Sequence, residues 1–212
     1  MTGSSIGRAG VTPSHPGIAE SEAAVSGYLL RPVENRDVPG ITDVYNEAVV
    51  AGGSTADLEP STVAQRREWV SSHVPRDRYP VLVLVRDPGS GADPDEGGGD
   101  RIEGFGSLSR FHPRPGYDGV VELSYYVSSR ARGRGCGTMI VNRLLREAVA
   151  HGHRMATAII YADNAASLAL MRRFGFTRFG LLPHACVDGR DPGWRTGRPR
   201  LGDMSYWYRD LV

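Results

Sequence analysis

A glycine-rich loop between a strand-like segment and a helical one constrains the fold of this chain more than any other stretch. β-Branched and aromatic residues at 120–127 predict a strand, and apolar residues at helical spacing in 139–150 predict a helix. Between them, Arg132, Gly135 and Gly137 follow the pattern Arg-x-x-Gly-x-Gly. Glycines let the backbone direct its N–H groups at a ligand, and the next helix adds unpaired N–H groups and the positive end of its dipole. The loop therefore predicts a site for phosphate or pyrophosphate.

The length and composition of the chain predict one domain in a reducing compartment. Its 212 residues suffice for a core without disulfides or metals. The formal net charge of +1 argues against a general nucleic-acid binder and against an acidic solvating chain. Cys136 and Cys186 cannot form a disulfide framework, and no apolar run is suited to cross a membrane or to act as a signal peptide. We expect a cytoplasmic protein with no membrane partner.

Three stretches lack the apolar periodicity of packed structure. Residues 1–27 are rich in Gly, Ser, Pro and Ala, which predicts a disordered tail, so the single domain is expected at 28–212. Residues 87–100 consist almost only of Gly, Asp, Pro and Glu, which predicts a flexible insertion between two strands. Residues 187–202 form an arginine-rich connection between the last two predicted strands.

Apolar periodicity and capping residues predict the order of elements in the domain. Strands are predicted at 28–33, 79–85, 102–109, 120–127, 155–161, 176–182 and 203–208. Helices are predicted at 38–49, 61–73, 139–150 and 165–174. The glycines within 102–109 suit a bulge or a close ligand. The loop at 51–60 joins the first two helices, and it is either one wall of a pocket or a mobile connection.

Two motifs on these elements resemble the GNAT superfamily of acyl-CoA-dependent N-acetyltransferases. One motif is the Arg-x-x-Gly-x-Gly loop. The other is Asn164-x-x-Ser167, followed by Gly175-Phe176 at the end of the same predicted helix. The resemblance spans 28–210, which is nearly the whole chain beyond the tail.

This resemblance implies an α/β (α+β) fold of the GNAT type. Its centre is a mixed, mostly antiparallel sheet of six to seven strands, flanked by about four helices. The sheet is expected to splay open between the strands at 120–127 and 155–161. The resemblance also implies acetyl-CoA, or another acyl-CoA, as co-substrate.

Within the superfamily, the chain is similar to the phosphinothricin N-acetyltransferase group, which acts on the α-amino group of small amino acids and their analogues. The shared features are Glu59-Pro60, the strand 121–127 with Glu122, the loop 131–137, and an aromatic last strand around Asp203 and Trp207. The chain departs from the group before Glu59, where aromatic and basic residues are missing, and at 188–202, which replaces a histidine-bearing segment. The resemblance implies a small-molecule amine acceptor, whose identity these two segments leave open.

The resemblance also implies roles for residues around the loop. Glu122 is expected to accept the proton of the attacking amine, directly or through water; the alternatives are a solvated carboxylate or a partner for the substrate's ammonium. Backbone N–H groups near Tyr126 and Val127 are expected to polarise the thioester carbonyl. The residues expected to hold the cofactor are Arg132, Gly133, Arg134, Gly135, Cys136, Gly137, Thr138, Asn164 and Ser167.

The proton donor to the leaving thiolate differs from the family pattern. Many GNAT enzymes place a tyrosine four residues before the Gly-Phe pair, but Met171 stands there and cannot donate a proton. Tyr125 or Tyr161 can take this role, although each also suits packing. A thiol with a pKa near ~8.5 leaves without an acid, so catalysis does not require one.

Other polar groups leave alternatives open. The histidines have no carboxylate or cysteine at metal-ligand spacing, so no metal site is expected. Arg190, Arg195, Arg198 and Arg200 can form a solvated loop, bind an anionic acceptor or contact RNA such as tRNA. Two alternatives to acetyl transfer are another acyl donor, including aminoacyl-tRNA, and a non-catalytic acyl-CoA-binding module. The family likeness also implies a homodimer formed through the last strands.

Overall fold

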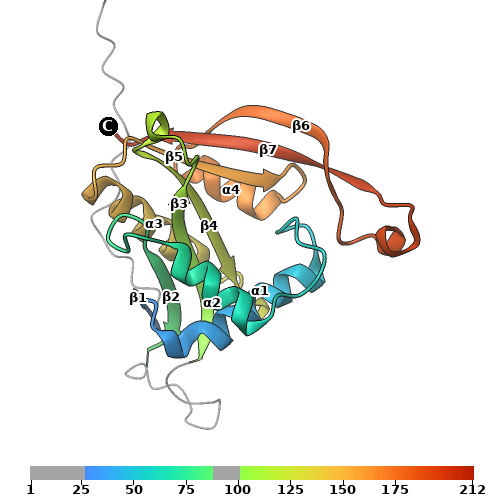
Figure 1. Ribbon diagram of the computed structural model, residues 1–212, viewed down its shortest axis with the longest axis horizontal. Helices are drawn as coiled ribbons and strands as arrows, with labels where there is room; N and C mark the ends of the chain where they lie inside the picture. The colour runs from blue at the N-terminus through green and yellow to red at the C-terminus, as the bar shows by residue number, and fades with distance from the viewer. Residues whose placement is uncertain (1–26, 88–100) are drawn as a thin grey trace, which may run out of the picture.

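A mixed seven-stranded sheet forms the centre of the computed structural model, which describes residues 27–87 and 101–212 (Figure 1). The strands are β1 (Tyr28–Pro32), β2 (Val81–Arg86), β3 (Ile102–Arg110), β4 (Val120–Val127), β5 (Met155–Tyr161), β6 (Thr177–Val187) and β7 (Leu201–Asp210). They lie in the order β1-β2-β3-β4-β5-β7-β6, and every neighbouring pair is antiparallel except β4 and β5. This confirms the expected mixed, mostly antiparallel sheet.

Two predicted segments fall largely outside the described residues. Of the tail predicted at 1–27 the structure describes only Gly27, and of the insertion predicted at 87–100 it describes only Asp87. Both remain predictions. Within the described ranges, no helix is long and apolar enough to cross a membrane.

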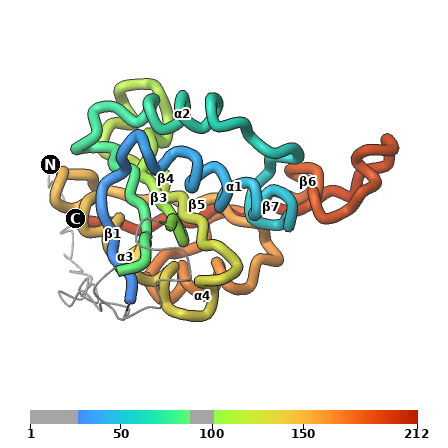
Figure 2. The backbone as a smooth tube through the Cα atoms, turned by 90° about the horizontal axis from the view of Figure 1, so that it is seen from below, coloured from blue at the N-terminus to red at the C-terminus, as the bar shows by residue number. Residues whose placement is uncertain are grey.

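The helices of the described part of the chain cover both faces of the sheet (Figures 1 and 2). α1 (Val38–Ala51) and α2 (Val63–Ser72) lie over one face, and α3 (Cys136–Ala150) and α4 (Ala165–Arg173) lie over the other. Apolar side chains on each face form a separate core cluster with the sheet between them. Short 3₁₀ segments occur at η1 (Asn35–Asp37), η3 (Pro115–Tyr117), η4 (Ser129–Ala131) and η5 (Pro192–Thr196).

Side-chain caps determine where two of the helices begin. Thr62 Oγ1 accepts a hydrogen bond from Gln65 N, and Gln65 Oε1 accepts one from Thr62 N. Asn164 Oδ1 accepts a hydrogen bond from Ser167 N. Such caps satisfy N–H groups that have no partner within the helix. Consequently α2 and α4 begin beside the capping residues that the sequence indicates.

Two glycines of β3 allow α3 to lie close to the sheet. A Cβ added at Gly106 would stand 2.5 Å from Ile140 Cγ2, and one at Gly104 would stand 3.2 Å from Ile140 Cδ1. The register between β2 and β3 also shifts beside Gly104, so the predicted bulge is present. The close neighbour is a helix rather than the predicted ligand.

β4 and β5 pair over a short distance and then separate. Their parallel ladder begins with Val120 opposite Met155 and ends with Glu122 opposite Thr157. Both strands continue beyond this point without pairing to each other. The facing backbone edges are therefore open, which confirms the predicted splay between these strands.

β6 and β7 form a hairpin that is longer than the strands predicted at 176–182 and 203–208. Their pairing extends to Val187 and Leu201, which shortens the connection to 188–200 (Figure 1). Most of the added residues are exposed. They therefore lack the apolar alternation by which a half-buried strand is recognised in a sequence.

Candidate active site

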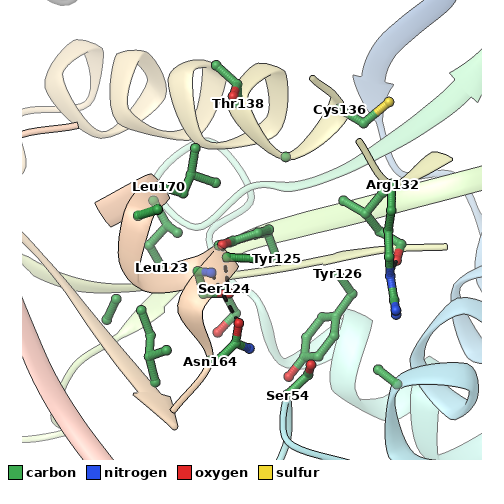
Figure 3. Close-up of a pocket in the computed structure, with 18 of the residues that line it drawn as sticks. Ser54, Leu123, Ser124, Tyr125, Tyr126, Arg132, Cys136, Thr138, Asn164 and Leu170 are labelled. Carbon is green, nitrogen blue, oxygen red and sulfur yellow. Dashed lines mark hydrogen bonds between the residues drawn. The ribbon is translucent and has the colours of Figure 1, made fainter. Parts of the chain in front are cut away.

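A cavity of about 530 Å³ opens where β4 and β5 separate (Figure 3). Its walls come from these two strands, the loop before α3, the N-terminal part of α3, and α4 along its length. All the predicted site residues except Glu122 and Arg134 line it. The lining members are Tyr125, Tyr126, Val127, Arg132, Gly133, Gly135, Cys136, Gly137, Thr138, Asn164 and Ser167. The fold thus brings both sequence motifs to one site.

The loop before α3 presents backbone N–H groups at this cavity. Gly133 and Gly135 have φ angles of 72° and 82°, in the left-handed region that favours glycine. Gly135 is the N-cap, so α3 begins at the next residue, three positions before the predicted start. The bond from Met139 N to Gly135 O leaves the N–H groups of 136–138 without a partner inside the helix.

These N–H groups and the space beside them form a place suited to an anion. A Cβ at Gly133 would meet no atom within 4 Å, so there is open space beside the loop. Arg132 lines the cavity, and its Nε donates to Val127 O at 3.3 Å. A helix N-terminus and a guanidinium together favour a bound anion. Arg134 is exposed and lies outside the lining.

The alternation of backbone groups along β4 determines which amides face the opening. Ser128 N donates to Glu103 O on β3 at 2.9 Å, and Tyr126 lies opposite Phe105 in the same ladder. Backbone groups of an antiparallel strand alternate between its two sides. The N–H of Tyr126 therefore points at β3, whereas that of Val127 points to the side of β5. Of the two amides predicted to polarise a carbonyl, the Val127 amide lies on the open edge.

Tyr125 is hydrogen-bonded to the second motif across the cavity wall (Figure 3). Its Oη donates to Ser167 Oγ at 3.0 Å. Asn164 Nδ2 in turn donates to Gly53 O at 3.1 Å, besides capping α4. Burial raises the pKa of Tyr125, which keeps its phenol protonated at physiological pH. Tyr125 can therefore donate a proton to an anion formed in the cavity.

Other residues named in the sequence have packing or backbone contacts. Met171 is fully buried in the core. Tyr161 lines the cavity, but its hydroxyl donates to Val187 O at 3.3 Å. Cys136 is buried, and burial raises the pKa of its thiol, which makes it a poor nucleophile. Within the described ranges, no group of three or more His, Cys, Asp or Glu residues is placed to hold a metal ion.

Glu122 lies at the fork between β4 and β5. It forms the last pair of that ladder with Thr157, and it faces Ser109 across the β3–β4 ladder. Side chains alternate along a strand, so Glu122 shares the α1–α2 face with Tyr126, while Tyr125 points to the face of α3. Burial raises the pKa of the Glu122 carboxyl, with no offsetting charge from the described residues. Such a carboxylate is a stronger base than one in water.

Comparison with known proteins places this geometry in a family. A family model described as an acetyltransferase (GNAT) domain matches residues 28–177. The chain belongs to the GNAT family. It is therefore an acetyl-CoA-dependent N-acetyltransferase, as the sequence motifs predict.

Several relatives of this acetyltransferase act on amino-acid analogues according to their names. The chain is 32% identical over 196 residues to the phosphinothricin N-acetyltransferase of Streptomyces coelicolor, covering 92% of this chain and 99% of that protein. It is 35% identical over 149 residues to the L-methionine sulfoximine/L-methionine sulfone acetyltransferase of Pseudomonas paraeruginosa. That match covers 69% of this chain and 78% of that protein.

A solved structure supports the same likeness. The phosphinothricin acetyltransferase of Sinorhizobium meliloti, crystallised with acetyl-CoA, matches with a TM-score of 0.73 at 28% identity. The match covers 87% of this chain and 89% of that one. The predicted likeness to the phosphinothricin acetyltransferase group is thus confirmed.

The loop between α1 and α2 is an ordered part of the acetyltransferase. Tyr45 Oη donates to Asp57 Oδ2 at 2.5 Å. Asn46 bonds both backbone groups of Ser61, donating to its O at 2.9 Å and accepting from its N at 2.8 Å. These bonds favour the pocket wall over the mobile connection for residues 51–60. Sequence reasoning missed them because each partner lies ten or more positions away.

Tyr126 connects this loop to the sheet. Its ring packs edge-on against Tyr45, with centroids 5.0 Å apart, and stacks on Phe105 at 5.2 Å. Burial raises the pKa of the Tyr126 hydroxyl. Ser54 lies beside Tyr126 in the cavity lining (Figure 3). The side chain of Tyr126 therefore lies on the α1–α2 side of the sheet, and Ser54 is a cavity-lining residue that no sequence motif indicates.

Carboxylates hold the arginine-rich tip of the β6–β7 hairpin. Asp188 is buried and accepts hydrogen bonds from Arg190 Nε at 2.7 Å and from Arg200 Nη2 at 2.5 Å. The bonds from Arg190 hold the pKa of Asp188 well below its usual range. Arg190 also binds Asp163 at 2.8 Å and packs so closely on Gly52 that a Cβ there would stand 2.6 Å from its Cγ. These two arginines are structural, which weakens the hypothesis of an anion-binding or RNA-binding cluster.

Proposed function

We propose that this acetyltransferase moves the acetyl group of acetyl-CoA to the α-amino group of a small amino acid or amino-acid-like metabolite, in resistance or biosynthesis. The observation that carries the proposal is the position of Glu122 at the fork, on the face that α1 and α2 cover. The relatives named for phosphinothricin and methionine sulfoximine support an acceptor of this class. In this proposal the loop at 51–60, whose Ser54 lines the cavity, supplies one wall of the acceptor pocket.

Backbone and side-chain donors of the cavity hold the acyl-CoA in this proposal. The N–H groups of 136–138 and the guanidinium of Arg132 bind its pyrophosphate. Asn164 and Ser167 bind the pantetheine arm with the hydrogen-bonding capacity left after their contacts within the chain. The bound acyl-CoA supplies the reactive thioester. None of these contacts involves the acyl group, so another acyl-CoA remains an alternative donor.

Glu122 is the proposed base. The α-amine of a free amino acid is mostly protonated at neutral pH and must lose one proton to solvent before it can attack. As the neutral amine then forms the new N–C bond, Glu122 accepts the surplus proton on the nitrogen, directly or through one water, and later releases it to solvent. Burial raises the pKa of Glu122, which brings it closer to the pKa of the amine and favours the transfer.

Val127 and Tyr125 complete the proposed reaction. The N–H of Val127, on the open edge of β4, stabilises the negative charge that develops on the carbonyl oxygen. As the C–S bond breaks, Tyr125 gives its phenolic proton to the sulfur and later regains one from solvent. Its hydrogen bond to Ser167 orients the hydroxyl within the cavity.

An acceptor panel tests the proposed function. The protein is incubated with acetyl-CoA and α-amino acids that include phosphinothricin and methionine sulfoximine, and the released thiol is measured. We expect turnover with at least one of these acceptors, and loss of that turnover in Glu122→Gln while acetyl-CoA binding by calorimetry is retained. No turnover with any acceptor, together with no binding of acetyl-CoA, would overturn the proposal.

The expected homodimer remains a prediction. Phe179, Leu181 and Leu182 on β6 are about half exposed, and they give the edge of the sheet an apolar surface. Such surfaces commonly mark protein contacts. Light scattering of the purified protein at several concentrations tests for the dimer.

A further inference from the structure

His73 connects the end of α2 to the sheet beside the proposed base. It follows the last residue of α2 and is 5% exposed. Its Nδ1 lies 2.8 Å from Trp69 O, and its Nε2 lies 3.0 Å from Ser109 Oγ on β3. No sequence motif points to this side chain.

The direction of these hydrogen bonds follows from the chemistry of their ends. A backbone carbonyl can only accept, so Nδ1 of His73 carries the hydrogen that bonds Trp69 O. Burial lowers the pKa of His73, and the charges of Arg76 and Arg66 lower it further, so the ring is neutral at physiological pH. Nε2 then has a lone pair, and the Ser109 hydroxyl donates to it.

Ser109 lies directly opposite Glu122 in the β3–β4 ladder. Residues opposite each other in an antiparallel pair project to the same face, with Cβ atoms about 4.5–5.5 Å apart. The hydrogen of Ser109 is already bonded to His73, so only its oxygen lone pairs are available to Glu122. Ser109 can accept a hydrogen bond from a protonated Glu122 but cannot donate one to the carboxylate.

We propose that His73 is a positioning residue for acyl transfer: it holds the Ser109 hydroxyl as an acceptor towards Glu122 and thereby favours the protonated form of the base. This inference rests on the proposed role of Glu122 and deepens it. When the amine N–H bond breaks, the proton forms an O–H bond on Glu122, and that O–H then donates to Ser109.

The surroundings of the three residues contain few competing charges. Thr157 faces Glu122 from β5, and its hydroxyl is bonded to a backbone oxygen, that of Val121. The charged groups that act on His73 are Arg66 of α2 and Arg76 of the following turn. Arg66 is itself held over the ring of Tyr45, with its guanidinium carbon 3.6 Å from the ring centroid. Burial is the only cause that shifts the pKa of Glu122, and no charged group of the described residues contributes to the shift.

The pKa of Glu122 can be measured without any acceptor, by carboxyl ¹³C NMR of glutamate-labelled protein, with the signal assigned through Glu122→Gln. In His73→Phe the freed Ser109 hydroxyl turns and donates to the carboxylate. Since a hydrogen bond to the charged form favours it, we expect the pKa of Glu122 to fall by about one pH unit. In the double variant His73→Phe, Ser109→Ala the donor is gone, and the value should return to within a few tenths of wild type.

Phenylalanine keeps the ring contact that His73 makes with Trp69, whose centroid lies 4.4 Å away. If it is not accommodated, His73→Met replaces it, because methionine fills irregular core space. The matched control is His153→Phe. His153 is also buried and also bonds a backbone carbonyl, that of Arg78, but it lies in the turn between α3 and β5.

The outcomes separate a positioning role from a structural one. A fall in the pKa of Glu122 in the His73 variant, reversed by Ser109→Ala and absent in His153→Phe, supports the inference. An unchanged pKa, or a fall that Ser109→Ala does not reverse, overturns it. Once the panel has identified an acceptor, the pH profile of kcat/KM can be measured. In the His73 variant its acidic limb should shift to lower pH, with little change in KM for acetyl-CoA. Failure of the acceptor panel alone would instead count against the proposed function.

Discussion

Glu122 on β4 and Thr157 on β5 form the last pair before the two strands separate. The backbone edge beyond this pair is open to a substrate, and the carboxylate stands at its beginning. The residue that carries this carboxylate is held by a ladder on each side of its strand, to β3 and to β5. Its place at the fork is therefore determined by backbone pairing rather than by a mobile loop.

Replacing Glu122 with glutamine should remove the proton acceptor while preserving the shape of the side chain. We expect kcat to fall by about 10²–10⁴-fold, the usual contribution of a general base, with little change in the affinity for acetyl-CoA. Steady-state kinetics with thiol detection and calorimetry check the two parts. Glu147→Gln on α3, which pairs with Arg143 away from the cavity, serves as the control and should retain wild-type kcat.

The pH dependence of the reaction should report the burial of Glu122. Burial raises its pKa above the ordinary value of 4.5 for glutamate. A base acts in its deprotonated form, so kcat/KM should decline as the pH falls through this raised value. A pH profile of kcat/KM measures this decline on the acidic side. The residual rate of Glu122→Gln should lack it, and a limb that persists in that variant would contradict the assignment.

Tyr125→Phe separates the two tyrosines considered as proton donors. The variant retains the ring but loses the hydroxyl that bonds Ser167. Because a thiolate leaves tolerably without an acid, we expect a modest fall in kcat of about tenfold. Tyr161→Phe, whose hydroxyl bonds Val187 O, should leave kcat near wild type. Thiol-release rates of the two variants at saturating substrates decide between them, and equal rates would argue against Tyr125 as the acid.

Gly137→Val should block the cofactor cavity without straining the backbone. The φ angle of Gly137 is not in the left-handed region. Its Cβ would stand 3.4 Å from Leu170 Cδ2 and 3.5 Å from Tyr125 Cε2, so the valine methyl groups would enter the cavity. We expect the Kd for acetyl-CoA to rise at least tenfold, which is about 1.4 kcal/mol, with little change in Tm. Calorimetry and thermal unfolding test this. Gly116→Val on the η3 segment, where a Cβ meets nothing within 4 Å, is the control.

Asp188→Asn should destabilise the protein without touching the reaction directly. The variant removes a buried carboxylate that accepts hydrogen bonds from Arg190 and Arg200. We expect a loss of about 1–3 kcal/mol in the free energy of unfolding, measured by urea denaturation. Asp77→Asn, at an exposed turn, should change it little.

The same substitution should alter how stability depends on pH. Hydrogen bonds from Arg190 lower the pKa of Asp188 in the folded state. Its contribution to stability is therefore present above the pKa of the unfolded aspartate, near ~3.9, and is lost as the pH falls towards the folded value. The difference in unfolding free energy between wild type and Asp188→Asn should shrink in that acidic range.

Features that depend on local sequence were predictable. Thr62 and Asn164 are capping residues whose partners lie three positions away, and both mark helix starts in the structure. Gly135 and its neighbours form the expected loop because their left-handed φ angles are a local property of glycine. The position of Glu122 followed from the strand that leads into this loop.

Contacts between segments that are distant in the sequence were not predictable, because the residues around each partner give no indication of the other. His73 and Ser109 are separated by 36 positions, and neither belongs to a recognisable motif. For the arginines at 190 and 200 the sequence left open a solvated loop, an anion site or an RNA contact. Their actual partner, the buried carboxylate of Asp188, is apparent only in the folded chain. Strand length in β6 and β7 was underestimated because exposed residues there carry no apolar alternation.

The close fit of Arg190 against Gly52 has a consequence for redesigning the loop at 51–60. Gly52 and Gly53 both have positive φ angles; a Cβ at Gly52 would clash with Arg190, and one at Gly53 would stand 3.2 Å from Arg190 Nη1. The loop and the hairpin tip therefore form a matched pair of surfaces, although about 140 positions of sequence separate them. Replacing the loop alone with that of a relative would leave a clash or a gap where the loop packs against Arg190. The two segments should be transplanted together, as a single cassette.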